Sequence, residues 1–80
     1  MDQIIQRLPK TKIVFDERTG EEITFQLDKD TIKKLMETYL PKWIDNKPYF
    51  LISQDFWGIH QQRLLYMNAI GTEFFVDYYH

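Results

Sequence analysis

Apolar and polar residues alternate along residues 12–27, KIVFDERTGEEITFQL, on both sides of a polar stretch. The apolar positions of this alternation are Ile13, Phe15, Ile23, Phe25 and Leu27. Gly20, inside the polar stretch, can adopt the positive φ that a tight turn requires. Apolar side chains at every second residue lie on one face of a strand. The pattern therefore predicts a β-hairpin that buries one of its faces.

The apolar period changes to that of a helix in residues 28–44, DKDTIKKLMETYLPKWI. The side chains at the spacing of one buried stripe are Ile32, Leu35, Met36, Tyr39 and Leu40. Asp28 or Asp30 can cap the first turn, because a carboxylate accepts hydrogen bonds from the amides that lack a partner there. Pro41 has no N–H group and disfavours the helical conformation at the residue before it, so we expect the helix to end or kink at this point.

Two apolar runs farther along the chain predict strands. Residues 48–53, PYFLIS, form a short continuous run that is typical of a strand buried on both faces. Residues 72–79, TEFFVDYY, are rich in β-branched and aromatic side chains and are expected to lie against it. Before these runs, Trp43 and Ile44 could extend the helical stripe by one turn, and residues 45–48, DNKP, have the composition of a turn.

The stretch between the two predicted strands, residues 54–70, has two interpretations. As a helix it would have Asp55 as its N-cap, apolar side chains at helical spacing, and Gly71 at its C-terminal end. As a hairpin it would contribute two strands around residues 68–72. The composition favours the helix, and the hairpin remains the alternative.

Together these elements predict an α+β fold in one small domain spanning residues 1–80, with three to five antiparallel or mixed strands. The expected order is an N-terminal β-hairpin, an amphipathic helix, a strand, a second helix or hairpin, and a C-terminal strand. Residues 1–10 are expected to form an irregular or short helical arm, with Ile5 and Leu8 inward and Pro9 as its end.

Composition narrows the ways in which so short a chain can be stabilised. A domain of 80 residues buries only about 60–65% of the surface that its unfolded chain exposes. It has no cysteine, which excludes disulfides and thiolate metal sites, and its two histidines make a structural zinc site improbable, so no metal or cofactor is expected. With 44% apolar residues it is globular, and it requires a good core or a partner subunit.

Charge and hydropathy limit the environment and the partners. The formal net charge is −2, with acidic and basic residues interleaved, which argues against a general nucleic-acid-binding protein. The chain contains no apolar run long enough for a transmembrane helix, and its first ten residues do not resemble a signal peptide. We therefore expect a cytoplasmic protein, of bacterial or phage type, with no membrane partner.

The clearest candidate for catalysis is the pair Asp55 and His60, and it fits poorly. Five residues along a helix correspond to a rotation of about 140° beyond a full turn, so this carboxylate could not orient the histidine. Ser53 has no glycine-framed turn that would make it a nucleophile, and His80 is the last residue. Phosphate-cradle and metal-loop motifs are missing as well, and the protein is predicted not to be an enzyme.

Acidic residues gather at the tip of the predicted hairpin. They are Asp16, Glu17, Glu21 and Glu22, and they surround a single Arg18. Four carboxylates at a turn could bind a cation or imitate a phosphate backbone, but the preferred interpretation is a solvated turn that keeps the protein soluble.

Aromatic residues are concentrated in the second half of the chain, which holds ten of the thirteen. A core of this size has room for about half of them. Three explanations compete: an ordinary core, a stacking platform for single-stranded nucleic acid, and a surface for protein binding or self-association. The last of these would centre on Trp57, Phe75, Tyr78 and Tyr79.

The function predicted from the sequence is a non-enzymatic interaction or regulatory module that binds a protein partner or itself. An inhibitor of a cellular enzyme is one form that it could take, and a regulator that binds single-stranded nucleic acid is the alternative. Surface charge discriminates between the two. Lys42, Lys47 and Arg63 gathered beside exposed aromatics would indicate nucleic acid, whereas a bare aromatic patch rimmed by Glu73 and Asp77 would favour a protein.

Overall fold

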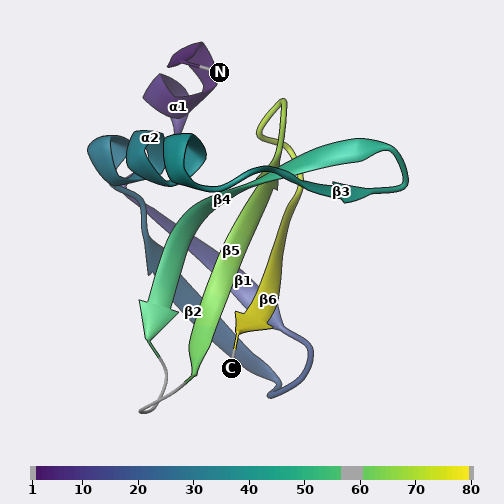
Figure 1. The fold of residues 1–80 in the computed structure, drawn as a ribbon. Helices are drawn as coiled ribbons and strands as arrows, with labels where there is room; N and C mark the ends of the chain where they lie inside the picture. The colour runs from purple at the N-terminus through teal and green to yellow at the C-terminus, as the bar shows by residue number, and fades with distance from the viewer. Residues whose placement is uncertain (1, 57–60, 80) are drawn as a thin grey trace.

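Two antiparallel sheets enclose the hydrophobic core in the computed structural model of the chain, which describes residues 2–56 and 61–79 (Figure 1). Within these residues the two-stranded sheet contains β1 (Thr11–Asp16) and β2 (Glu21–Gln26). The second sheet has the order β3-β4-β5-β6, formed by β3 (Lys42–Ile44), β4 (Lys47–Phe56), β5 (Gln62–Asn68) and β6 (Phe74–Tyr79). The helices are α1 (Asp2–Arg7) and α2 (Lys29–Thr38). The α+β class predicted from the sequence is confirmed, but the described residues form six strands and not the three to five expected.

The core takes side chains from both helices and both sheets. Its buried members are Ile5, Ile23, Phe25, Leu27, Ile32, Ile52, Leu65 and Met67. The two helices lie together at one end of the sheets (Figure 1), with Ile5 of α1 and Ile32 of α2 both buried. The N-terminal arm is thus a short helix that seals one end of the core.

The hairpin β1–β2 is confirmed, but the prediction of which face it buries was wrong for β1. Phe25 is 1% exposed, whereas Ile13 and Phe15 are 58% and 59% exposed. Residues paired across an antiparallel ladder share a face, and here Val14 pairs with Ile23 while Phe15 pairs with Glu22. The cross-strand register therefore places Val14, and not Ile13 or Phe15, on the core side.

Helix α2 begins and ends close to the predicted positions. The Asp28 carboxylate accepts from the N–H of Thr31 at 3.0 Å and from its hydroxyl at 2.8 Å, and these bonds lower the pKa of Asp28. The helix ends at Thr38, three residues before Pro41. The prediction that Tyr39 and Leu40 continue the buried stripe was wrong, since they are 51% and 93% exposed.

The segment after α2 forms a hairpin and not a further helical turn. Trp43 and Ile44 lie in β3, which corrects the idea that they extend the helical stripe. Asp45 and Asn46 both have positive φ, as a two-residue turn between antiparallel strands requires. β4 then continues to Phe56, beyond the predicted end of this strand.

Of the two interpretations for residues 54–70, the hairpin is confirmed and the helix was wrong. Asp55 lies in β4, where it pairs with Arg63 of β5 and does not cap a helix. Along β5 the buried residues are Arg63, Leu65 and Met67, a period of two. Pairing with strands on both sides satisfies the backbone of β5, and this outweighs the modest helix propensity of its residues.

The turn between β5 and β6 is organised by Asn68. Its side-chain oxygen accepts from the N–H groups of Thr72 at 2.8 Å and Glu73 at 3.0 Å. Gly71 has a φ of 73°, and a Cβ there would lie 2.8 Å from Ile4. Glycine is thus required by both backbone conformation and space. The turn brings β6 alongside β5, so the expectation that residues 72–79 lie against residues 48–53 was wrong: β5 lies between β4 and β6.

Candidate interaction surface

The four-stranded sheet turns one face to the core and the other face outward. In its ladders Tyr66 lies opposite Leu51 and Phe75, and Gln62 lies opposite Phe56 and Tyr79, so each of these rows of three shares the outer face. A groove of about 490 Å³ lies on this face, and we call it the outer groove. Its lining residues are Tyr39, Leu40, Leu51, Gln54, Phe56, Gln62, Leu64, Tyr66 and Tyr79. None of these described lining residues carries a formal charge.

A cluster of three rings stiffens the sheet next to the outer groove. The ring of Phe75 stacks on Tyr66 with a centroid distance of 5.1 Å and meets Tyr49 edge to face at 5.1 Å. The Tyr49 hydroxyl donates to a Glu73 carboxylate oxygen at 2.9 Å. Phe75, which the sequence proposed as part of a binding surface, is half-buried in this cluster.

An ion pair crosses this face between its first and last strands. Lys42 of β3 forms an ion pair with Asp77 of β6. The same ammonium group lies 5.7 Å from the Tyr66 ring centroid and 6.0 Å from that of Phe75. Together with Glu73, which accepts from Tyr49, two carboxylates and one cation lie around the ring cluster.

Two tyrosines of the outer face have raised pKa values. Burial raises the pKa of Tyr66 above its ordinary value, with Lys42 opposing and Asp77 adding to the effect. The pKa of Tyr49 is raised chiefly because its hydroxyl donates to Glu73. In both cases the folded protein holds the phenolic proton more tightly than the unfolded chain does.

These raised pKa values predict a loss of stability at high pH. Their contribution is complete below the ordinary tyrosine pKa of about 10, and it is lost as the pH rises through the higher folded values. We expect the urea-unfolding free energy of the wild type to fall more between about pH 9 and about pH 11 than that of the variant Tyr49→Phe/Tyr66→Phe. Equal falls in the two proteins would contradict this assignment.

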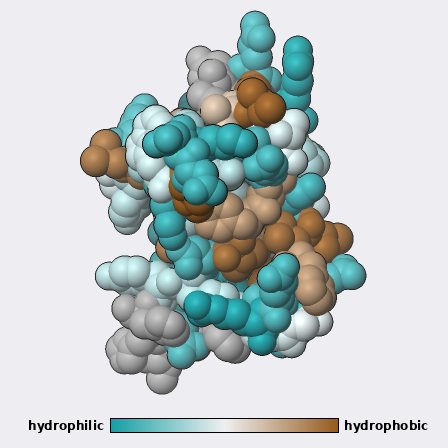
Figure 2. Space-filling model, turned by 90° about the vertical axis from the view of Figure 1, so that its right-hand side faces the viewer, coloured by the Kyte–Doolittle hydropathy of each residue, from teal (hydrophilic) through white to brown (hydrophobic). Residues whose placement is uncertain are grey.

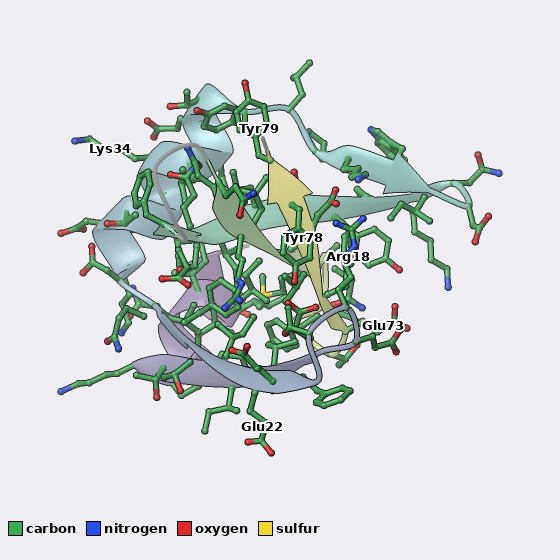
Figure 3. The ribbon with its side chains drawn as sticks, turned by 90° about the horizontal axis from the view of Figure 1, so that it is seen from below. Arg18, Glu22, Lys34, Glu73, Tyr78 and Tyr79 are labelled. Carbon is green, nitrogen blue, oxygen red and sulfur yellow. The ribbon has the colours of Figure 1, made fainter. Side chains whose placement is uncertain are left out.

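The residues that the sequence grouped as one binding patch lie in different places. Tyr79 is 61% exposed and lines the outer groove. Tyr78 points to the opposite side of the sheet, toward the β1–β2 hairpin, where the Arg18 guanidinium lies 4.5 Å from its ring centroid (Figure 3). Trp57 lies outside the described residues, as do His60 and His80.

The four acidic residues of the predicted hairpin tip also lie in different environments. Asp16 is 3% exposed, accepts from the N–H of Arg18 at 3.0 Å, and lies 3.9 Å from Nε of Arg63, which is 5% exposed. Glu21 approaches the same guanidinium at 4.0 Å. Glu17 and Glu22 are exposed, and Glu22 points away from the sheets in Figure 3. Asp16 and Arg63 therefore form an internal ion pair between the sheets and not part of a solvated turn.

Sequence reasoning missed several groove residues and one buried cation. Tyr39 and Leu40 were assigned to the core, and Phe56 and Leu64 to a helix, so their meeting around one groove was not foreseen. Arg63 was named only as one of three cations whose position would discriminate between partners, and its burial was not predicted. Its burial could have been recognised from its position two residues before Leu65. In a strand, residues two apart point to the same face, so Arg63 and Leu65 share one.

Other kinds of site find no support among residues 2–56 and 61–79. This part of the chain contains no group of three or more His, Cys, Asp or Glu side chains able to hold a metal ion. Neither of its helices has the length and apolar character needed to cross a membrane. The chain matches no protein-family model, and comparison with curated proteins and with solved structures found no significant match.

Proposed function

We propose that this protein is a non-enzymatic interaction module that binds a protein partner at the outer groove. The observation that carries the proposal is a concave surface of about 490 Å³ lined by aromatic, aliphatic and glutamine side chains without formal charge. Tyrosines in such a setting contribute large apolar area together with a hydroxyl group. A partner with one or two apolar anchor side chains and neighbouring backbone amides suits this lining.

The exposed apolar side chains around the outer groove support the proposal. Leu40 is 93%, Phe56 is 74% and Tyr79 is 61% exposed, although each is a large apolar or aromatic group. Contiguous exposed apolar groups are typical of interaction sites. The ring cluster beside the groove restricts Tyr66, and a rigid surface loses less conformational entropy on binding.

The charges favour a protein partner over single-stranded nucleic acid. Nucleic acid would require cations along the aromatic face to neutralise phosphates. Arg63 is instead buried on the core side beside Asp16, and Lys42 is paired with Asp77. A cytoplasmic protein that regulates or inhibits a cellular enzyme through this surface is the form of the proposal that agrees with the sequence.

A pair of matched variants tests the proposal. The groove variant is Phe56→Ser/Leu64→Ser, which leaves β6 unchanged. The control variant is Ile13→Ser/Phe15→Ser on the exposed face of the hairpin, where Ile13 and Phe15 are 58% and 59% exposed and Phe56 of the groove is 74% exposed. Proteins captured by the immobilised wild type would be purified and titrated against all three proteins by calorimetry. The partner is expected to lose at least about tenfold in affinity for the groove variant and little for the control.

Two results would overturn the proposal. One is a partner that binds the groove variant normally but loses affinity for the control variant, which would move the site to the hairpin. The other is tight, salt-dependent binding of a fluorescent oligo-dT strand that the groove variant abolishes, which would assign the same surface to nucleic acid.

A further inference from the structure

Strand β6 forms one edge of the four-stranded sheet. Within the described part of the chain its single neighbour in the sheet is β5, and the ladder between them runs without a register shift (Figure 1). Its sequence, FFVDYY, contains neither proline nor lysine, the residues that commonly protect sheet edges. Figure 2 views the molecule from the side of β6 and shows apolar side chains gathered across the middle of this side.

Hydrogen bonds show which backbone groups of β6 face away from β5. The Asn68 N–H donates to the carbonyl oxygen of Glu73 at 3.1 Å, so the backbone of Glu73 points toward β5. Since the direction alternates along a strand, the backbones of Phe74, Val76 and Tyr78 point outward. In agreement, the Tyr78 N–H donates at 2.8 Å to the carboxylate of Asp77 and not to β5.

The space beside β6 is open. A groove of about 340 Å³ runs between β6 and β1, with Val14 on one side and Phe74 and Val76 on the other. Strand β1 pairs with β2 in the other sheet, so it does not occupy the hydrogen-bonding edge of β6. This edge therefore has the backbone donors of Phe74 and Val76 and the room to accept a further strand.

We propose that the strand that pairs with this edge is β6 of a second copy of the chain, antiparallel about a twofold axis at Val76. In this register Val76 pairs with Val76 of the second copy, and Phe74 pairs with Tyr78 in both directions. Val76 exchanges both of its backbone hydrogen bonds with Val76 of the second copy, and the N–H of Phe74 donates to the carbonyl group of Tyr78 in both directions, while the Tyr78 N–H keeps its bond to Asp77. The two four-stranded sheets become one continuous sheet, and the interface is isologous.

The charges of the strand select this register and favour self-pairing. A shift of two residues in one direction would place Asp77 opposite Asp77 of the second copy. The same shift in the other direction would place Asp77 opposite Glu73. Like charges directly opposite one another destabilise a sheet, whereas the proposed register places Asp77 opposite Phe75. Glu73 then lies opposite Tyr79 of the second copy, so no two carboxylates of the paired strands face each other.

Cysteine cross-linking tests the twofold axis directly, because the chain has no cysteine of its own. In Val76→Cys the two Cα atoms would lie about 5.5 Å apart, within the range that a disulfide spans. In the control Tyr79→Cys they would lie roughly 20 Å apart, six residues along the paired strands. Under mild oxidation we expect Val76→Cys to become mostly covalent dimer while Tyr79→Cys stays monomeric. Tyr79 is more exposed than Val76. If disulfides formed only by random collision, Tyr79→Cys would therefore cross-link more than Val76→Cys.

The solution mass provides a second measurement that needs no cross-link. Light scattering across a concentration series is expected to show a reversible wild-type dimer. Val76→Pro removes an outward N–H and leaves the β5 ladder intact, so it should weaken the dimer by about tenfold or more. Ile13→Pro, at the outer edge of β1, is the matched control and should leave the mass unchanged.

A wild type that is monomeric throughout, together with equal cross-linking of the two cysteine variants, would overturn the edge pairing. Should Val76→Pro unfold, as circular dichroism would show, the cysteine pair still decides the question. Tyr79 is the one described lining residue of the outer groove that lies in β6, and the groove variant leaves it unchanged. Loss of partner binding in the groove variant and loss of the dimer in the β6 variant are therefore separate results.

Discussion

Replacing Arg63 by alanine is expected to lower the free energy of unfolding by about 3–5 kcal/mol, a large part of the total for so small a domain. The guanidinium is 5% exposed and lies between the carboxylates of Asp16, which is 3% exposed, and Glu21. Its removal would leave the Asp16 carboxylate charged, between two sheets, and without this cation. Urea denaturation at neutral pH measures the change.

Two further variants distinguish the effect of leaving a buried charge without its partner from the general effect of removing an arginine. Arg18→Ala removes an exposed arginine whose guanidinium contacts the Tyr78 ring, and it should cost about 0.5–1 kcal/mol. Arg63→Met/Asp16→Leu removes both charges and should recover most of the stability lost in Arg63→Ala. A cost below about 1 kcal/mol for Arg63→Ala would mean that water reaches Asp16 and that the pair is not internal.

Phe25→Ala is expected to destabilise the protein by about 3–5 kcal/mol, the usual cost of removing a large side chain from a packed core. Phe25 is 1% exposed and packs in the core that β2 forms with both helices and with β4 and β5. The cavity would open where the two sheets meet, so we also expect a less cooperative thermal transition. Calorimetry and urea denaturation provide the measurement.

Phe15→Ala is the matched control, because it removes the same side chain from the other strand of the same hairpin. Phe15 is 59% exposed, so we expect a change of at most about 0.5–1 kcal/mol. Comparable losses for the two variants would show that the hairpin buries both faces. That result would contradict the register that places Phe15 opposite Glu22.

The elements that local chemistry controls were predictable from the sequence. Asp28 caps α2, and the helix ends before Pro41, because a capping carboxylate and a missing N–H act within one turn of the chain. The β1–β2 hairpin with Gly20 at positive φ follows from alternation and from the freedom of glycine.

The candidate surface was predictable only in part. An excess of aromatic residues in the second half of the chain indicated that some of them would remain outside the core, and Tyr79 does lie on the outer groove. Tyr78 and Phe75, its neighbours in the same strand, lie beside Arg18 and in a ring cluster instead. Strand alternation separates Tyr78 from Tyr79, but which face meets the second sheet depends on contacts with β1 and β5.

Residues 54–70 are the segment whose secondary structure the sequence alone did not determine. Their propensities and spacing fit a helix about as well as a hairpin, and the outcome depends on two partner strands that lie elsewhere in the chain. The same dependence turned Phe15 outward and buried Arg63 against Asp16, because a one-residue difference in cross-strand register exchanges the faces of a strand. Composition, turns and caps thus determine the fold class and the ends of α2. Pairing between distant segments decides which side chains reach the core, the ion pair and the outer groove.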